Sequence, residues 1–280
     1  MALNRFKTLF GRTLFNVIGM VHVDALPGTP KCTHKMDAII ERALKDVEIY
    51  KSANVDSILI ENMHDIPYQH TSQVGPEIVA SMTAVCCKIR DQCPNIPLGI
   101  QILAGANHQA LAVALAAGLD YIRAEGFVFA HVADEGLMNS CAAEVLRYRR
   151  QIGAEHIHVF TDVKKKHSSH AITSDVSITE TVKAAEFFLS DGVILTGTST
   201  GAVTDVNEFT DARNECNLPV LIGSGVTSDN IELYSKAHGL IVGSHFKENG
   251  NWLNPVDSVR VNKFMDKVRK LRSSNTTEIS

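Results

Sequence analysis

The amino-acid sequence predicts a single (β/α)8 TIM barrel, an α/β fold in which eight parallel strands close into one sheet. Three observations lead to this prediction. Short apolar, β-branched runs recur eight times along the 280 residues, and helix-like stretches follow these runs. Each run also ends at a glycine, an acid, a histidine or a hydroxyl residue. Barrels of this kind carry their chemistry at the carboxyl ends of the strands, where this chain places its polar residues.

The predicted strands follow one another at regular intervals. They begin at Asn16, Ser57, Pro97, Tyr121, His156, Gly192, Pro219 and Gly239. Between them, apolar residues recur with the period of an amphipathic helix, as at Met82, Val85 and Ile89. Ser177 and Glu180 predict a capping box at the start of the helix after the fifth strand.

The barrel is predicted to span residues 16–272 as one domain, because no linker-like segment divides the chain. Residues 273–280 form a polar tail that is expected to be flexible. Residues 1–15 form an N-terminal arm that is basic and free of acids, and in this respect resembles a weak organelle-targeting segment. A short helix that closes the bottom of the barrel is the favoured interpretation of the arm.

The amino-acid composition argues against nucleic acid and membranes as binding partners. The net charge of −4 gives no basic footprint for nucleic acid or for an anionic membrane, so neither is an expected partner. No apolar run approaches the roughly 18 residues that span a bilayer. The six cysteines form no CxxC pair and no zinc spacing, which indicates reduced thiols. A cytoplasmic location is therefore expected, with a mitochondrion or another organelle as the alternative.

Two glycine turns near the end of the chain predict a phosphate site. The seventh predicted strand ends in Gly223, Ser224 and Gly225, and the eighth ends in Gly243 and Ser244. In many barrels the loops after these two strands bind phosphate through backbone N–H groups, which glycine leaves accessible to the anion. The serine hydroxyls are expected to add donors. Ordinary tight turns are the alternative, but the pairing on consecutive strands favours phosphate.

A third glycine-rich stretch follows the sixth predicted strand, from Thr196 to Gly201. Its hydroxyls and glycines suit an anion nest or a flexible lid, and a solvated turn fits the pattern equally well. Thr196, Gly197 and Gly201 are therefore included among the predicted phosphate-binding residues.

Ionisable side chains gather at the predicted ends of the first, second, fourth and fifth strands, where the fourth strand ends in Arg123 and Glu125. Acids, histidines and a lysine that converge on one face suit general acid–base catalysis or metal binding. The predicted catalytic residues are His22, Asp24, Glu61, Asp65, Asp162, Lys166 and His167.

The same face predicts a candidate site for a divalent metal. Glu61 and Asp162 offer oxygen ligands that suit Mg²⁺ or Mn²⁺, and His22 extends the choice to Zn²⁺. No fingerprint of a nucleotide cofactor occurs in the sequence. The lysine run at residues 164–166 is interpreted as a solvated charge run, with a lysine that forms a Schiff base as the minority alternative.

In its motifs the chain resembles the BtpA family, over nearly its whole length from Phe10 to Met265. The resemblance implies a barrel of the ribulose-phosphate-binding type and, from some bacterial relatives, a sugar or sugar phosphate as the ligand. The family takes its name from a role in photosystem I biogenesis. The motifs that carry the resemblance are residues 20–30, 61–68, 162–163, 166–167, 196–201, 223–226, 241–244 and 254–257.

Two functions follow as hypotheses. The first is a lyase, isomerase or hydrolase that acts on a small phosphorylated sugar or nucleoside-like metabolite. The second is a non-catalytic assembly factor that uses the barrel as a scaffold. An open, polar cavity would favour the enzyme, and a cavity plugged by apolar side chains would favour the scaffold. A homo-oligomer is expected because two-fold assemblies are the most common. Replacing Asp162 by asparagine is expected to abolish activity with little loss of stability.

Overall fold

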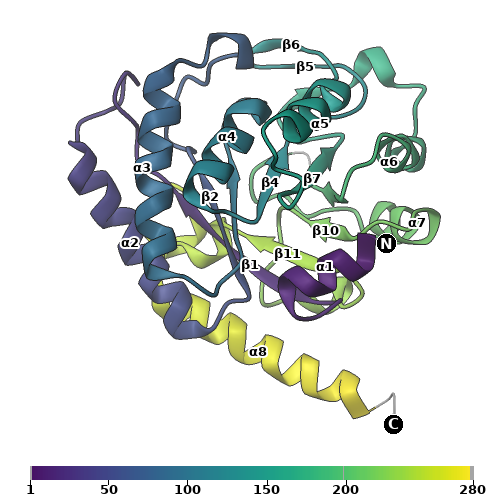
Figure 1. The fold of residues 1–280 in the computed structure, drawn as a ribbon. Coiled ribbons are helices and arrows are strands. Elements are labelled where there is room, and N and C mark those ends of the chain that lie inside the picture. The colour runs from purple at the N-terminus through teal and green to yellow at the C-terminus, as the bar shows by residue number, and fades with distance from the viewer. Residues whose placement is uncertain (1, 198, 278–280) are drawn as a thin grey trace.

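The computed structural model describes residues 2–197 and 199–277. It confirms the predicted barrel, in which eight parallel strands close in the order β1-β11-β10-β9-β7-β4-β3-β2, with helices around the outside (Figure 1). The barrel strands are β1 Asn16–His22, β2 Ser57–Glu61, β3 Leu98–Gln101, β4 Tyr121–Ala124, β7 His158–Val163, β9 Gly192–Leu195, β10 Val220–Ile222 and β11 Gly239–Val242.

Six of the seven connections between successive barrel strands carry an α-helix, and α8 follows the last strand. Between β10 and β11 only a short 3₁₀ helix forms, because Ser228, Asp229 and Asn230 favour turns over a continuous helix. The α-helices are α1 Ala2–Phe10, α2 Met36–Ala53, α3 Pro76–Gln92, α4 Asn107–Ala117, α5 Ala142–Gln151, α6 Ile178–Phe187, α7 Val206–Glu215 and α8 Ser258–Thr277. The 3₁₀ helices are η1 Thr71–Gln73, η2 Ala171–Thr173, η3 Ile231–Tyr234, η4 Ser244–Phe246 and η5 Glu248–Gly250. The predicted capping box of Ser177 and Glu180 begins α6.

The interior of the barrel is filled by inward-facing side chains that pack against α1. Phe6 and Phe10 of α1 contact Phe160 of β7, with ring centroids 5.9 and 6.2 Å apart. Tyr121 is fully buried beside them, and a Cβ on Gly99 would lie 2.1 Å from its ring. The glycine therefore makes room for an aromatic plug at the amino-terminal end of the barrel, which leaves the carboxyl end for a site.

Helix α1 is held in place by charge as well as by packing. The Arg5 guanidinium lies 2.7 Å from a carboxylate oxygen of Asp191, whose second oxygen pairs with Arg149 at 2.6 Å. Asp191 also accepts the backbone N–H of Val159 at 2.9 Å. The N-terminal arm is thus a structural part of the barrel in this molecule.

A small antiparallel sheet stands beside the carboxyl end of the barrel, where the sequence predicted only loops. Its strands are β5 His131–Ala133, β6 Gly136–Met138 and β8 Ser168–Ser169, in the order β6-β5-β8. The loops that follow β4 and β7 therefore pair with each other and form one wall near the site (Figure 1).

The C-terminal helix is longer than predicted. Helix α8 continues to Thr277, so residues 273–277 extend the helix, whereas the sequence predicted a flexible tail from residue 273. The polar residues there lack an apolar period, and the pattern therefore gave no signal for the last turn. All six cysteines stand as free thiols in the structure. Within the described chain, no helix has the length and apolar character needed to cross a membrane.

Candidate active site

Two adjoining cavities open at the carboxyl ends of the barrel strands. One has a volume of about 200 Å³ and the other about 470 Å³. Their linings share the floor residues Glu61, Met63, Arg123, Lys166 and Thr200, so the two cavities form two lobes of one site. We call the first the glycine lobe, because it is lined by Gly201, Gly225, Gly243 and Gly250. We call the second the aromatic lobe, because it is lined by Tyr68 and Trp252 with Met63, Ile66 and Leu103.

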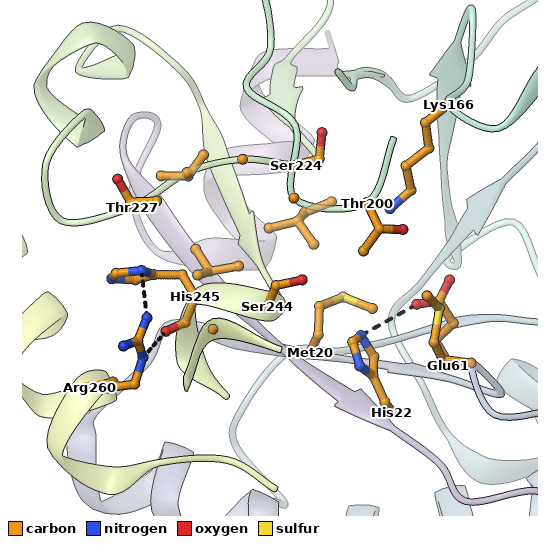
Figure 2. A pocket seen from close by; sticks show the side chains of 18 of the residues that line it. Met20, His22, Glu61, Lys166, Thr200, Ser224, Thr227, Ser244, His245 and Arg260 are labelled. Carbon is orange, nitrogen blue, oxygen red and sulfur yellow. Dashed lines mark hydrogen bonds and ion pairs between the residues drawn. The ribbon is translucent and has the colours of Figure 1, made fainter. Parts of the chain in front are cut away.

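The glycine lobe presents donors to an anion. Among the described residues, the backbone N–H groups of Gly225 and Ser244 donate to no backbone acceptor, and both residues line the lobe. The Arg260 guanidinium stands at its edge and donates from Nε to the His245 carbonyl at 2.7 Å, which fixes its position (Figure 2). Backbone amides and a fixed guanidinium are suited to a phosphate.

The Ser224 hydroxyl, which was predicted to contact phosphate, instead bonds to backbone groups of a neighbouring loop. Its hydroxyl accepts the N–H of Gly197 at 2.7 Å and donates to the Ala202 carbonyl at 3.0 Å, so it joins the loops after β9 and β10. A Cβ on Gly197 or Gly225 would lie 2.4 or 2.3 Å from the Ala202 oxygen. These glycines therefore allow two backbones to touch, a role that the sequence pattern did not distinguish from anion binding.

The predicted phosphate residues divide into two groups. Five of them line the glycine lobe, and three lie behind it. Thr196 accepts the N–H of Lys166 on its hydroxyl at 3.1 Å and thereby positions that lysine. Gly223 packs against Ile194, where a Cβ would lie 2.6 Å away. The five are Gly201, Ser224, Gly225, Gly243 and Ser244, and the three are Thr196, Gly197 and Gly223. Thr198 lies outside the described residues.

Glu61 and His22 lie side by side on the floor of the glycine lobe. His22 Nε2 is 3.8 Å from Glu61 Oε2, and the two side chains are 5% and 9% exposed (Figure 2). Burial is the main cause that raises the pKa of Glu61, against the opposing charge of Arg123. Burial, followed by the charge of Lys247, holds the pKa of His22 well below its usual range. An imidazole whose pKa is lowered thus stands beside a carboxyl group whose pKa is raised.

Lys166 points into the shared part of the site from the end of β7 (Figure 2). Its Nζ makes no hydrogen bond or ion pair with any described residue. Burial and then the positive charge of Arg123 lower the pKa of its ammonium group, although Glu61 opposes the shift. An amine whose pKa is lowered and a carboxyl whose pKa is raised both move towards neutral pH, which suits proton transfer.

Two buried ion pairs support these groups from below. Arg123 holds Asp162, with Nη2 3.0 Å from Oδ1 and side chains that are 4% and 1% exposed. Burial raises the pKa of Asp162 despite the charge of Arg123. Lys165 Nζ lies 3.2 Å from Glu125 Oε1. Burial by itself would raise the pKa of the Glu125 carboxyl. The positive charges of Lys165 and Arg123 outweigh burial, so the pKa of Glu125 is lowered.

His167 lines the aromatic lobe and orders the loop above it. Its Nε2 accepts the Thr200 N–H at 3.1 Å and lies 2.9 Å from the Thr200 hydroxyl. Burial lowers the pKa of His167, followed by the charge of Lys166. A neutral ring nitrogen that accepts a backbone N–H positions the loop, and the predicted catalytic role of His167 stays a prediction.

Two of the predicted catalytic acids point away from the site. Asp24 pairs with Arg42 at 2.9 Å on the surface. Asp65 is buried beneath the first loop, where it accepts the N–H of Leu26 at 2.7 Å and the hydroxyl of Thr29 at 3.0 Å. Neither acid lines either lobe. Both residues lie beyond the strand ends, where the loop rather than the sheet decides the direction of a side chain.

Asp65 is therefore expected to act on stability rather than on chemistry. Replacing Asp65 by alanine should lower the free energy of unfolding by about 2 kcal/mol, because its carboxylate also accepts from Asn62 at 2.9 Å and three donors lose their acceptor. The matched change Asp24→Ala removes an exposed ion pair and should cost less than about 1 kcal/mol. Urea unfolding measures both. Equal losses in the two variants would contradict the structural role of Asp65.

The residues predicted to bind a metal do not gather around one point. Within residues 2–197 and 199–277, no group of three or more His, Cys, Asp or Glu side chains is placed to hold a metal ion. Asp162 is occupied by Arg123, with Nε 3.1 Å from each of its two oxygens, and only His22 lies beside Glu61. This donor set does not fit a divalent ion, so side chains alone are left to carry the chemistry of the site. The predicted Mg²⁺, Mn²⁺ or Zn²⁺ stays a prediction.

The structure adds site residues that the sequence did not single out. Gln101 lies in the aromatic lobe because it ends β3 with an inward-facing side chain, and its position at a strand end was the available signal. Asp134 and Glu135 reach the lobe from the turn of the β5–β6 hairpin, for which the sequence gave no strand signal.

The fold and the cavity define the class: a (β/α)8 barrel with a polar site at the carboxyl ends of its strands. Within that class the chain belongs to the BtpA family, whose model matches residues 14–270. An uncharacterized mitochondrial protein of Caenorhabditis elegans is 50% identical and aligns over 91% of this chain and 94% of its own length. The photosystem I biogenesis protein BtpA of Synechocystis is 34% identical, over 89% of this chain and 86% of its own.

Solved structures with the same fold are far more distant in sequence. Thiamine phosphate pyrophosphorylase from Pyrococcus furiosus has a TM-score of 0.56 at 11% identity, covering 92% of this chain and 97% of its own. N-(5'-phosphoribosyl)anthranilate isomerase from the same organism has a TM-score of 0.55 at 12% identity, covering 91% and 99%. At this identity the likeness establishes the barrel fold.

Proposed function

We propose that the protein is an enzyme that acts on a small phosphorylated sugar or nucleoside-like metabolite. The single observation that carries this proposal is the arrangement of the cavity. Donors that suit a phosphate line one lobe, and Glu61 and Lys166 stand on the floor beside them with their pKa values shifted towards neutrality. The names of the barrels with the same fold, which include a phosphate pyrophosphorylase and a phosphoribosyl isomerase, support the choice of a phosphorylated ligand.

The reaction we propose begins with a proton transfer. The phosphate is held by the amides of Gly225 and Ser244 and by Arg260, which places the sugar above the floor. Lys166 in its neutral form takes a proton from the substrate. Glu61 in its protonated form donates a proton to the substrate, either to a carbonyl oxygen or to the oxygen or nitrogen of the leaving group. Such a pair suits isomerisation or the cleavage of a C–C or C–N bond. The ring of His22 lies beside Glu61, with Nε2 3.8 Å from Oε2, and lines the same part of the site.

An assembly factor is the second candidate, and one observation favours it. The Synechocystis relative is named as a photosystem I biogenesis protein. A scaffold, however, has no need of a cavity with buried ion pairs and a lysine on its floor that pairs with none of the described residues. The open and polar cavity therefore supports the enzyme, by the criterion that separates the two functions.

Partners and compartment follow as further parts of the proposal. A small phosphorylated metabolite is the partner that the glycine lobe suits. The worm relative is described as mitochondrial, which favours that organelle over the cytoplasm for this chain. A homo-oligomer stays an expectation from the frequency of two-fold assemblies.

Arg260 provides the test of the phosphate site. Wild-type protein is expected to bind ribose 5-phosphate in a calorimetric titration. Arg260→Gln should weaken this binding by about 10- to 100-fold, because a hydrogen bond to a charged group contributes about 1.5–3 kcal/mol. The control Arg42→Gln changes an arginine that lines neither lobe and should bind like the wild type. Wild-type protein that binds neither ribose 5-phosphate nor inorganic phosphate would refute the proposed site.

A further inference from the structure

The aromatic lobe supports an inference about the substrate that rests on the proposed phosphate site. We infer that the substrate is a phosphorylated riboside whose planar, uncharged ring carries N–H donors, as a nucleobase does. The phosphate occupies the glycine lobe, the ribose lies over the shared floor, and the ring occupies the aromatic lobe. This assignment selects the nucleoside-like class over a bare sugar phosphate.

The size and connection of the two lobes give the first argument. The aromatic lobe, at about 470 Å³, is larger than the glycine lobe, and the shared floor carries Glu61 and Lys166. A ligand whose phosphate sits in the glycine lobe and whose reacting bond lies over this floor must extend into the aromatic lobe. A bare pentose phosphate would end at the floor and would leave the apolar walls beyond it without a contact.

The walls of the aromatic lobe suit a flat ring. The Trp252 ring lies 5.2 Å from the His64 ring, with a tilt of 33°, which fixes its orientation. The Tyr68 hydroxyl donates to the Met63 carbonyl at 2.7 Å, so the polar end of this side chain is occupied and its ring is held in place. Ile66 and Leu103 complete the apolar lining. Fixed aromatic and apolar walls favour stacking of a planar group.

Two buried hydrogen-bond acceptors in the aromatic lobe indicate that the ligand ring carries hydrogen-bond donors. Gln101 Oε1 and Glu135 Oε2 are buried without a hydrogen-bond partner among the described residues, and both side chains line the aromatic lobe. The Gln101 amide orientation is set, because its Nε2 donates to Glu125 Oε1 at 3.1 Å. An unpaired buried acceptor is costly, and N–H groups on a ligand would satisfy both atoms.

The charges at the far end of the lobe disfavour an acidic ring. Asp134 and Glu135 line it there beside Lys165, which is already paired with Glu125 at 3.2 Å, whereas Arg123 and Lys166 belong to the floor that it shares with the glycine lobe. A carboxylate on the ligand ring would face these two acids at short range, which is unfavourable. A neutral ring with N–H donors, such as cytosine, adenine, guanine or uracil, meets both conditions.

Calorimetric titration of the full chain with ribose 5-phosphate and with the four ribonucleoside 5'-monophosphates tests the inference. At least one mononucleotide should bind about tenfold or more tightly than ribose 5-phosphate. In Trp252→Ala this advantage should disappear, while the dissociation constant for ribose 5-phosphate changes less than about twofold. The matched control is Phe187→Ala, which removes an exposed aromatic side chain outside both lobes and should leave every affinity unchanged. Glu135→Ala should weaken the mononucleotide and leave ribose 5-phosphate unaffected.

The outcomes separate this inference from the proposed function. If ribose 5-phosphate binds and no mononucleotide binds more tightly, the assignment of the aromatic lobe is wrong and the phosphate site stands. The same conclusion follows if Trp252→Ala weakens both classes of ligand equally. If no phosphorylated compound binds at all, the phosphate site is refuted and the assignment of the ring falls with it.

Discussion

Replacing Arg123 by methionine is expected to lower the free energy of unfolding by about 3–5 kcal/mol, because the change leaves the Asp162 carboxylate buried without its partner. Arg123 Nε lies 3.1 Å from both Asp162 oxygens, and neither side chain is more than 4% exposed. Urea unfolding followed by circular dichroism measures the loss. Because domains of this kind are stable by only about 5–15 kcal/mol, the variant should be close to unfolding.

The double variant Arg123→Met with Asp162→Leu is the control for this expectation. Removing both charges eliminates the unpaired carboxylate, so the double variant should recover much of the lost stability. A single variant that stays within about 1 kcal/mol of the wild type would contradict the account. The same reasoning corrects the expectation from sequence that Asp162→Asn would spare stability: the change leaves the buried Arg123 without a charged partner and should destabilise the fold as well.

Lys166→Met is expected to reduce turnover of a phosphorylated substrate by about 10²- to 10⁴-fold, which is the usual contribution of a positioned acid or base. Binding of ribose 5-phosphate should change little, because the phosphate lies in the glycine lobe. The variant should also fold normally, since Lys166 Nζ has no partner among the described residues to lose.

The direction of the pH dependence follows from the shifted pKa values. Lys166 acts as a base when neutral, and the lowering of its pKa makes this form available at lower pH than in a free lysine. Glu61 acts as an acid when protonated, and the raising of its pKa keeps this form available at higher pH than in a free glutamate. Because both forms are needed together, turnover should pass through a maximum between the two pKa values and fall at lower and at higher pH. A second readout needs no substrate: labelling of Lys166 by an amine reagent, followed by peptide mass spectrometry, should have its midpoint below the reference value of about 10.4 for a free lysine. A midpoint at or above that value would contradict the assigned role.

The fold could be predicted from the sequence because strand and helix periods alternate along the whole chain. The β5, β6 and β8 strands could not, because two or three residues such as Ser168 and Ser169 show no period of their own. Their pairing depends on a contact between two loops that are distant in the chain. The C-terminal extension of α8 was missed because its residues are polar on all sides.

Part of the site could be predicted because the barrel fold itself brings the strand ends together. The carboxyl ends of parallel strands meet at one face, so His22, Glu61 and Lys166 were expected together and line the same cavity. Asp65 follows β2 at a greater distance, and loop geometry turns its carboxylate towards Leu26 instead. The hydroxyl of Ser224 was expected to face a ligand, but it joins two loops, which a sequence motif does not reveal.

The central claim is that this cavity carries out chemistry on a phosphorylated riboside. Proton NMR of the wild-type protein incubated with the mononucleotide or sugar phosphate that binds most tightly tests it most directly, with Lys166→Met run in parallel. New ligand signals are expected with the wild type, and none with Lys166→Met over the same period, although both proteins bind the ligand. A ligand that binds both proteins and stays chemically unchanged with the wild type would contradict the claim and favour the scaffold.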